Sequence, residues 1–322
     1  MSELRFDGRV AIVTGAGRGM GRAFALLLAS RGASVVVNDL KSDSGELRSA
    51  ADDVVEEIKA SGGEAVASYG SVITAEGAES IVKTAIDSFG RVDILINNAG
   101  VSNWTPFEDI GYEEFERNRS VHYDGPWRVT RAAWPFMRQQ KYGRILFITS
   151  HVGTAGARNV AHYGSAKWAS AGMARMLSFE GGDADIRSNA LGVLGYTRLL
   201  TDTFFTPDGA EAPSMDNIAG EEEWWKANFS TDKVAPVAAW LVHEKCHLNG
   251  EILDTGGGHT FHLFFSATEG FVKPDLTLED VDENMPKILD ASRTNVFSSV
   301  EAALNNRLGK LQAAGVKPVN AR

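Results

Sequence analysis

Cysteine, long apolar runs and an excess of basic residues are what this sequence of 322 residues lacks. Its one cysteine, Cys246, excludes a disulfide within the chain and is typical of a reducing compartment. No apolar run approaches the ~20 residues of a membrane-spanning helix, and the first residues, MSELRFDGRV, lack the apolar core of a signal peptide. The net charge of −10 argues against a general affinity for nucleic acid. We therefore expect a cytoplasmic protein whose partners include neither a membrane nor a nucleic acid.

What the sequence contains is an alternation of strand-like and helical segments. A short apolar run, RVAIVT, is followed by a glycine-rich turn, an apolar-faced helix and a second strand, SVVVND. Further strands are expected at EAVASY, VDILINNAG, GRILFITS, IRSNALGV and GEILDTGGG, with helices at 48–61, 75–89 and 112–140 between them. This order predicts an α/β fold, a doubly wound parallel sheet with helices on both faces.

Two regions depart from this alternation. Residues 199–230 mix aromatic side chains with proline, glycine and acids, which is typical of a substrate-binding loop or lid. Beyond the last expected strand, Thr277 and Asp280 form a helix-capping pattern. A later helical stripe consists of Val300, Leu304, Leu308 and Leu311. We expect one domain over 1–258 and a C-terminal helical extension over 259–322, whose apolar faces need a partner surface in this chain or in another subunit.

The glycine-rich turn, TGAGRGMG at residues 14–21, has the context of a dinucleotide site. Glycines at 15, 19 and 21 would let a diphosphate approach backbone N–H groups at the start of the following helix, as in a Rossmann-type fold. Asp39 ends the second strand, where a carboxylate can accept hydrogen bonds from the adenosine ribose and repel a 2′-phosphate. This favours NAD, although Arg18 could pair with such a phosphate and favour NADP instead.

Three motifs in fixed order give a family resemblance. TGAGRGMG is followed by NNAG at 97–100 and by Ser150, which stands thirteen residues before YGSAK at 163–167. Over about residues 6–258 the chain resembles the short-chain dehydrogenase/reductase family. ASVVVNDL, RQQKYGRI, TRAAWPFM and the helical tail are most similar to the (3R)-hydroxyacyl-CoA dehydrogenase part of peroxisomal multifunctional enzymes and its bacterial relatives.

Tyr163 and Lys167 are one helical turn apart, so their side chains lie on one face of a helix. A phenol has a reference pKa of about 10, and an ammonium beside it, together with the nicotinamide charge, favours the phenolate. The resemblance implies that Tyr163 transfers the proton, that Lys167 lowers its pKa and binds the ribose, and that Ser150 hydrogen-bonds the substrate oxygen.

Three departures from the family pattern concern the same site. His122 stands where most members have an asparagine that completes a proton relay; it can serve the relay or simply pack between helices. Val193 and Leu194 replace the usual Pro-Gly beside the nicotinamide, while Thr197 matches the carboxamide-binding threonine. The acid usual near the adenine is missing, which leaves Ser71 and Val72 at that position.

The resemblance thus implies two sets of site residues. The expected catalytic residues are Ser150, Tyr163, Lys167 and His122. The expected NAD-binding residues are Gly15, Arg18, Gly19, Met20, Gly21, Asp39, Leu40, Ser71, Val72, Asn98, Ala99, Gly100, Tyr163, Lys167 and Thr197. No metal is expected, although HEKCH at 243–247 matches the H-E-x-x-H zinc pattern, because that pattern needs a helix open to a cleft and a third ligand.

These residues predict an NAD-dependent oxidoreductase that interconverts a secondary alcohol and a ketone. A 3-hydroxyacyl-CoA and a steroid, terpene or aryl-alkyl alcohol are both open as substrates. Phe and Trp in the 199–230 loop suit a hydrophobic substrate, whereas its many acids suit CoA phosphates poorly: Asp202, Asp208, Glu211, Asp216 and Glu221–Glu223. A rival from another class is a catalytically inactive NAD-binding module. By resemblance, we expect a homodimer or homotetramer formed through helix faces.

Overall fold

A computed structural model describes residues 3–41, 48–204 and 222–316 of the chain. The chain divides into two compact units, Met1–His262 and Leu263–Arg322.

The first unit is built on an eight-stranded sheet of order β3-β2-β1-β4-β5-β6-β7-β8. Strands β1 to β7 pair in parallel, and the two-residue connection between β7 and β8 makes that last pair a hairpin. The sheet therefore continues past Gly258, where the sequence had predicted its end. The strands are β1 Val10–Thr14, β2 Ser34–Asn38, β3 Glu64–Ser68, β4 Ile94–Asn97, β5 Gly143–Ser150, β6 Ile186–Leu194, β7 Ile252–Gly256 and β8 His259–Leu263.

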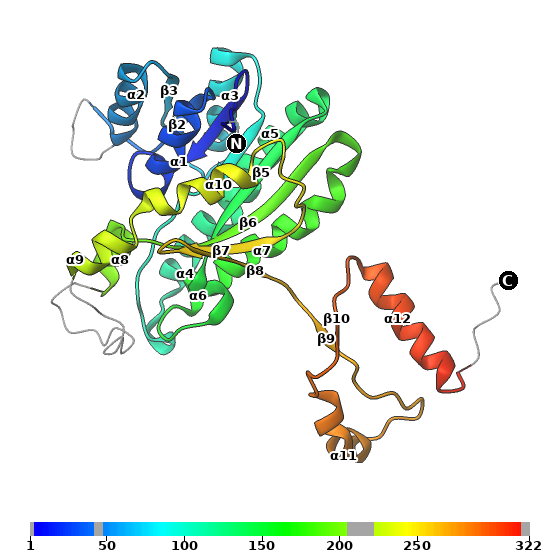
Figure 1. Cartoon of the computed structure of the whole chain (residues 1–322). Coiled ribbons are helices and arrows are strands. Elements are labelled where there is room, and N and C mark those ends of the chain that lie inside the picture. The colour runs from blue at the N-terminus through cyan, green and yellow to red at the C-terminus, as the bar shows by residue number, and fades with distance from the viewer. Residues whose placement is uncertain (1–2, 42–47, 205–221, 317–322) are drawn as a thin grey trace. The chain divides into compact units, whose positions relative to one another are not determined.

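Helices cover both faces of this sheet, which confirms the doubly wound α/β prediction (Figure 1). On one face α1 contacts α2 and α10; on the other α3 contacts α5, and α7 packs on β5 and β6. The helices of this unit are α1 Gly19–Ser30, α2 Ala50–Ala60, α3 Ala75–Phe89, α4 Tyr112–Arg119, α5 Gly125–Gln140, α6 His151–Ala155, α7 Ala161–Glu180, α8 Arg198–Phe204, α9 Glu222–Asn228 and α10 Ala235–Leu241.

The central strand β1 is buried along its whole length because helices cover both faces of the sheet. In β1, Ala11 and Val13 join the core beneath α1, α2 and α10, whereas Val10 and Ile12 point to the other face. The buried β-branched run RVAIVT is the expected sequence of such a central strand. The core on either side fixes the positions of the strand ends, and the glycine-rich turn, Asp39 and Ser150 stand at or directly after such ends.

The helix expected over 112–140 has a different form. The helical path persists, but a π-helical turn, Ser120–Asp124, separates α4 from α5. A π turn widens the helix locally and is often found at functional sites. Here it carries His122, whose side chain is buried.

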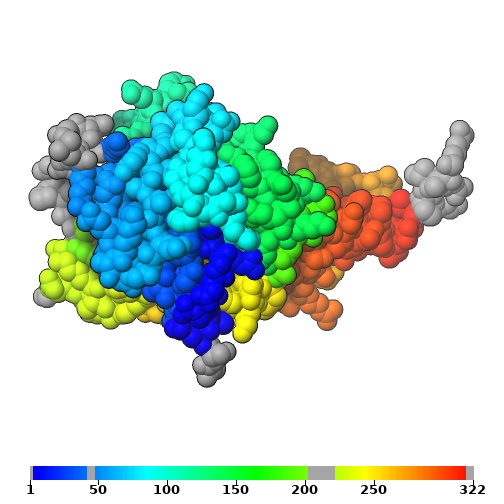
Figure 2. Space-filling view, turned by 90° about the horizontal axis from the view of Figure 1, so that it is seen from above, coloured from blue at the N-terminus to red at the C-terminus, as the bar shows by residue number. Residues whose placement is uncertain are grey.

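The HEKCH segment lies outside any helix, since α10 ends at Leu241. His243 is buried: its Nδ1 accepts the Lys245 N–H at 3.1 Å, and its Nε2 lies 3.1 Å from the carbonyl oxygen of Arg5. Figure 2 shows the N-terminal segment (dark blue) beside this part of the chain (yellow). Within 3–41, 48–204 and 222–316, no group of three or more His, Cys, Asp or Glu side chains is arranged to hold a metal ion.

The C-terminal unit contains helices α11 (Leu278–Ile288) and α12 (Val300–Ala313) and a two-stranded antiparallel sheet of β9 (Ala267–Thr268) and β10 (Thr294–Asn295). The predicted Thr277/Asp280 capping box is confirmed at the start of α11. No residue of 263–316 is buried, and Val300 on the predicted apolar stripe is 82% exposed. Neither unit contains, in its described residues, a helix long and apolar enough to cross a membrane.

Candidate active site

The candidate cofactor site lies where the strand order reverses, between β1 and β4. Their carboxyl ends are neighbours, and this crevice is where parallel α/β sheets bind ligands. The Thr14 hydroxyl accepts the N–H groups of Asn98 (3.0 Å) and Ala99 (3.1 Å), and Asn98 Nδ2 donates to the carbonyl oxygens of Thr14 (2.9 Å) and Gly15 (3.0 Å). These bonds join the predicted NNAG segment to the glycine-rich turn.

The glycine-rich turn itself needs its glycines. Gly15 and Gly19 have φ values of +62° and +53°, in the left-handed region, and a Cβ on Gly21 would lie 2.3 Å from the Gly15 carbonyl oxygen. The first turn of α1 has no acidic residue, and its N-cap residue, Arg18, makes no side-chain capping bond. The backbone N–H groups at this helix start thus fit an anionic diphosphate.

Asp39 directly follows β2, whose end the sequence predicts there, and its carboxylate lies against the glycine-rich turn. Its Oδ2 accepts the N–H of Gly17 at 2.9 Å, and its Oδ1 accepts the N–H of Leu40 at 2.9 Å. Arg18 and Leu40 are exposed. A Cβ on Gly17 would lie 2.7 Å from Asp39 Oδ2, so Gly17 is required for this contact. Sequence reasoning missed Gly17, although it stands within the quoted motif.

Ser71 and Val72 follow β3 and pack onto helices. The side chain of Val72 is buried against Gly125, where an added Cβ would lie 3.0 Å from it, and the backbone of Ser71 lies against Gly77. Asn38 at the end of β2 donates to the carbonyl oxygens of Ser68 (3.2 Å) and Gly70 (2.9 Å). The structure therefore brings this segment beside the end of β2.

Val193 and Leu194, which replace the usual Pro-Gly, form the end of strand β6. Both residues belong to β6 and pair with Thr255 and Gly256 of β7, a pairing in which proline would lack the N–H donor. The chain then turns back to the glycine-rich turn. A Cβ on Gly195 would lie 2.1 Å from Met20 Cε, and a Cβ on Gly19 would lie 3.4 Å from Thr197 Cγ2. Met20, Gly19 and Thr197 are thus neighbours.

Ser150, Tyr163 and Lys167 come together at the carboxyl end of β5. Ser150 caps α6, and all three side chains are buried. Burial raises the pKa of the Tyr163 phenol above its ordinary value, although a hydrogen bond with Ser150 acts in the opposite direction. This direction is opposite to the lowering expected from Lys167. Lys167 Nζ donates to the carbonyl oxygen of Ile148 at 2.8 Å and lies 5.8 Å from the centre of the Tyr163 ring. Burial lowers the pKa of Lys167 to about 8.

His122 contacts this group from the π-helical turn. Its Nε2 lies 2.6 Å from the Val101 carbonyl oxygen, and its Nδ1 is buried without a hydrogen-bond partner in the described chain. Burial, and secondarily the charge of Lys167, lowers the pKa of His122 well below its usual value, which keeps the ring neutral. A Cβ on Gly100 would lie 2.8 Å from His122 Cε1, so this glycine lets the ring approach.

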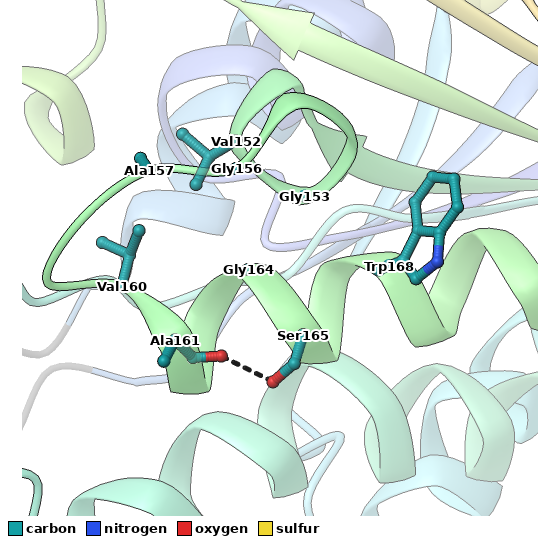
Figure 3. Close-up of a pocket in the computed structure, with 9 residues that line it drawn as sticks. All are labelled: Val152, Gly153, Gly156, Ala157, Val160, Ala161, Gly164, Ser165 and Trp168. Carbon is teal, nitrogen blue, oxygen red and sulfur yellow. Dashed lines mark hydrogen bonds between the residues drawn. The ribbon is translucent and has the colours of Figure 1, made fainter. Parts of the chain in front are cut away.

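A pocket of about 240 Å³ lies between α6 and α7 (Figure 3). Ala161, Gly164, Ser165 and Trp168 line it from α7, and Val152 and Gly153 from α6. None of the predicted site residues lines this pocket. The predicted substrate loop, 199–230, is described only in part: residues 205–221 lie outside the described chain. In α9, Trp225 is buried and its ring centre lies 4.5 Å from that of Phe229.

Sequence reasoning also missed a group of polar side chains next to Tyr163. Glu114 of α4 receives hydrogen bonds from Asn103, Thr105 and His162, the last of which precedes Tyr163. No spacing rule connects residues so far apart in the sequence.

Comparison with known proteins gives the same family as the motifs. A family profile described as short chain dehydrogenase matches residues 9–203. Peroxisomal multifunctional enzyme type 2 of Mus musculus is 39% identical over 327 aligned residues, which cover 98% of this chain and 42% of that protein. The chain thus spans less than half the length of this relative.

Similar solved structures come from enzymes of the same kind. The full-length peroxisomal multifunctional enzyme type 2 of Drosophila melanogaster has a TM-score of 0.76 and 31% identity, covering 96% of this chain and 50% of that one. A 7α-hydroxysteroid dehydrogenase in complex with NADH and 7-oxo glycochenodeoxycholic acid has a TM-score of 0.68 and 30% identity, covering 80% of this chain and 98% of its own. The chain belongs to the short-chain dehydrogenase/reductase family and is an oxidoreductase that acts on CH–OH groups.

Proposed function

We propose that the chain oxidises the secondary hydroxyl of a 3-hydroxyacyl thioester to a ketone, with NAD as its cofactor. The observation that carries this proposal is the extent of the similarity. The match to the multifunctional enzymes covers 96–98% of the chain and so includes the C-terminal unit, whereas the hydroxysteroid dehydrogenase covers 80%.

The cofactor fits the residues at the switch point. The glycine-rich turn and the start of α1 would hold the diphosphate, and Asp39 would receive the adenosine ribose. Thr197, beside Gly19, would contact the carboxamide. When bound, NAD supplies the acceptor for the hydride that leaves the carbinol carbon.

The proton leaves through side chains of this chain. Tyr163, as the phenolate, takes the proton of the substrate hydroxyl, and Ser150 donates a hydrogen bond to the same oxygen. Lys167, when protonated, would supply a positive charge beside the phenol and would bind the ribose of the cofactor. His122, neutral and in contact with Tyr163, belongs to the path by which the proton leaves.

The chain is also proposed to work as a homodimer or homotetramer in a reducing compartment, the cytoplasm. Large apolar side chains are exposed on α5 and α7, the helix faces through which association is expected. They are Trp127, Phe136, Trp168, Met176 and Phe179.

The test is a screen of NAD reduction, followed by absorbance, over both enantiomers of 3-hydroxyacyl-CoA esters, hydroxysteroids, terpene alcohols and aryl-alkyl alcohols. Tyr163→Phe serves as the inactive control. We expect the largest kcat/KM with one enantiomer of a 3-hydroxyacyl-CoA and at least a hundredfold loss in the variant. A higher kcat/KM with a steroid, terpene or aryl-alkyl alcohol would contradict the proposal that the substrate is a thioester. If the protein bound NADH but turned over none of these substrates, the result would favour the alternative that the chain is a catalytically inactive NAD-binding module.

A further inference from the structure

The segment that follows β4, Val101–Pro106, has no regular secondary structure but is held at its backbone. Its first residue lies against His122, as described above. Farther along, the Thr105 N–H donates to the carbonyl oxygen of Asn159, in the loop before α7, at 2.8 Å. The segment therefore lies between the π-helical turn and the beginning of the helix that carries Tyr163.

Side chains of this segment converge on one carboxylate. Glu114, in the first turn of α4, accepts on its Oε1 from Asn103 Nδ2, from Thr105 Oγ1 at 2.6 Å and from His162 Nε2 at 3.0 Å. Asn118 extends the group, because its Nδ2 donates to Asn103 Oδ1 at 3.1 Å and to the Glu114 carbonyl oxygen at 3.2 Å. We call these five residues the Glu114 cluster.

His162 joins this cluster to the catalytic helix. Its side chain is 0% exposed, and its backbone is covalently bound to that of Tyr163. Burial lowers the pKa of His162, although Glu114 acts in the opposite direction, so the neutral ring donates a hydrogen bond from Nε2–H to the carboxylate. The other ring nitrogen, Nδ1, is buried without a partner among the described residues, so the ring is held through Nε2, which lies 3.0 Å from Glu114 Oε1 and 3.3 Å from Asn103 Oδ1.

A surface ion pair does not have these features. Exposed carboxylates on helices often pair loosely with a long basic side chain, with little effect on structure. Here the Glu114 side chain is only 25% exposed, and its donors come from the loop after β4 and from α7. Several charge-assisted bonds to one partly buried oxygen fix geometry more firmly than a single exposed pair.

We propose that Glu114 is a positioning residue for the reaction: its carboxylate ties the Val101–Thr105 segment to the first turn of α7 and thereby sets the substrate side of the site around Tyr163. This inference rests on the proposed catalytic role of Tyr163. The cofactor side is held by other contacts, those between Thr14 and the NNAG segment. Loss of the Glu114 carboxylate should therefore affect substrate turnover more than NADH binding.

The experiment compares Glu114→Ala with Glu113→Ala in the full chain. Glu113 is the neighbouring acid in the same helix turn and is exposed, so both variants lose one negative charge at the start of α4. His162→Leu removes the donor from α7, and His162→Gln retains an N–H donor as the conservative variant. The measurements are the melting temperature, the NADH Kd, kcat and KM, and amide hydrogen exchange of residues 101–105 in the NADH complex.

We expect Glu114→Ala and His162→Leu to raise exchange in 101–105 and to lower kcat/KM at least tenfold, with the NADH Kd within twofold of wild type. His162→Gln should recover much of the loss, and Glu113→Ala should behave as wild type. Exchange in 101–105 unchanged by Glu114→Ala, or kinetics equal to those of Glu113→Ala, would overturn the proposal. Exchange needs no substrate: if wild type turned over nothing, the proposed function would fail, while exchange would still decide whether Glu114 holds the segment.

Discussion

The imidazole ring of His122 stands at 89° to the phenol ring of Tyr163, with the ring centres 5.1 Å apart. Edge-to-face packing of this kind fixes both rings. It also places the unpartnered Nδ1 of a neutral histidine in the buried region around the tyrosine. The contact is compatible with packing alone and with a proton path, which substitution can separate.

His122→Asn should keep substantial activity, because an amide can still accept and donate a proton-path hydrogen bond and is the commoner residue of the family. His122→Leu fills similar space without polar atoms, and we expect it to slow turnover and change the pH profile of kcat. Steady-state kinetics between pH 6 and pH 10 check this. Equal, near-wild-type rates for the two variants would assign His122 to packing.

We expect Lys167 to make NADH binding sensitive to pH. Because burial lowers its pKa to about 8, the ammonium loses its proton as pH rises through that value. If the charged form binds the ribose, the Kd for NADH should rise above pH 8 by at most about tenfold per pH unit. Lys167→Ala should bind weakly at every pH, whereas Lys167→Arg, which stays charged, should lose the pH dependence. Fluorescence titration at several pH values measures the NADH Kd. A wild-type Kd that does not change with pH would contradict the proposed role of Lys167 in binding the ribose.

Asp39 should set the choice of cofactor. We expect wild type to have a higher kcat/KM with NAD than with NADP, because the Asp39 carboxylate repels a 2′-phosphate. Asp39→Ala should reduce the ratio of kcat/KM for NAD to that for NADP by at least about tenfold. The experiment is a pair of cofactor titrations at fixed substrate. Equal use of NADP by wild type would show that Arg18, exposed at the same turn, determines the preference.

Gly17→Ala tests the contact that only the structure shows. Its Cβ would lie 2.7 Å from Asp39 Oδ2 and 2.7 Å from Ala50 Cβ, so we expect a loss of about 1–3 kcal/mol in the free energy of unfolding and weaker NADH binding. Gly309→Ala, in α12, where an added methyl meets nothing within 4 Å, is the control. Urea unfolding measures the stability of each variant, and titration measures its NADH Kd. A Gly17→Ala protein with wild-type stability and NADH affinity would contradict the close contact between Gly17 and Asp39.

Deletion of the C-terminal unit tests the expected partner surface. The cut belongs after Leu263, so that β8 stays in the sheet. With the exposed stripe of α12 gone, we expect a higher substrate KM or dissociation of the oligomer, while NADH affinity changes little because its residues lie before residue 198. Kinetics and light scattering measure these. Unaltered kinetics and the same subunit number would show that the unit is independent of the site.

The sequence by itself determined the features that depend on neighbours along the chain. Alternating apolar runs and helices predicted the doubly wound sheet, glycines in one short turn predicted the dinucleotide site, and the spacing of Tyr163 and Lys167 predicted a shared helix face. Periodicity and one-turn spacings are read within a short window, so no knowledge of packing is needed.

Only the tertiary structure decided contacts between residues distant in sequence. The bond from Gly17 to Asp39, the contact of His122 with Val101 and the pair of Glu114 with His162 join separate elements. Each depends on how helices and loops pack after the sheet has formed, and the wider π turn that aims His122 inward has no local signal. Residue types and their spacing along the chain therefore predicted which chemical groups the site contains. The packing of distant segments determined which of these side chains are in contact.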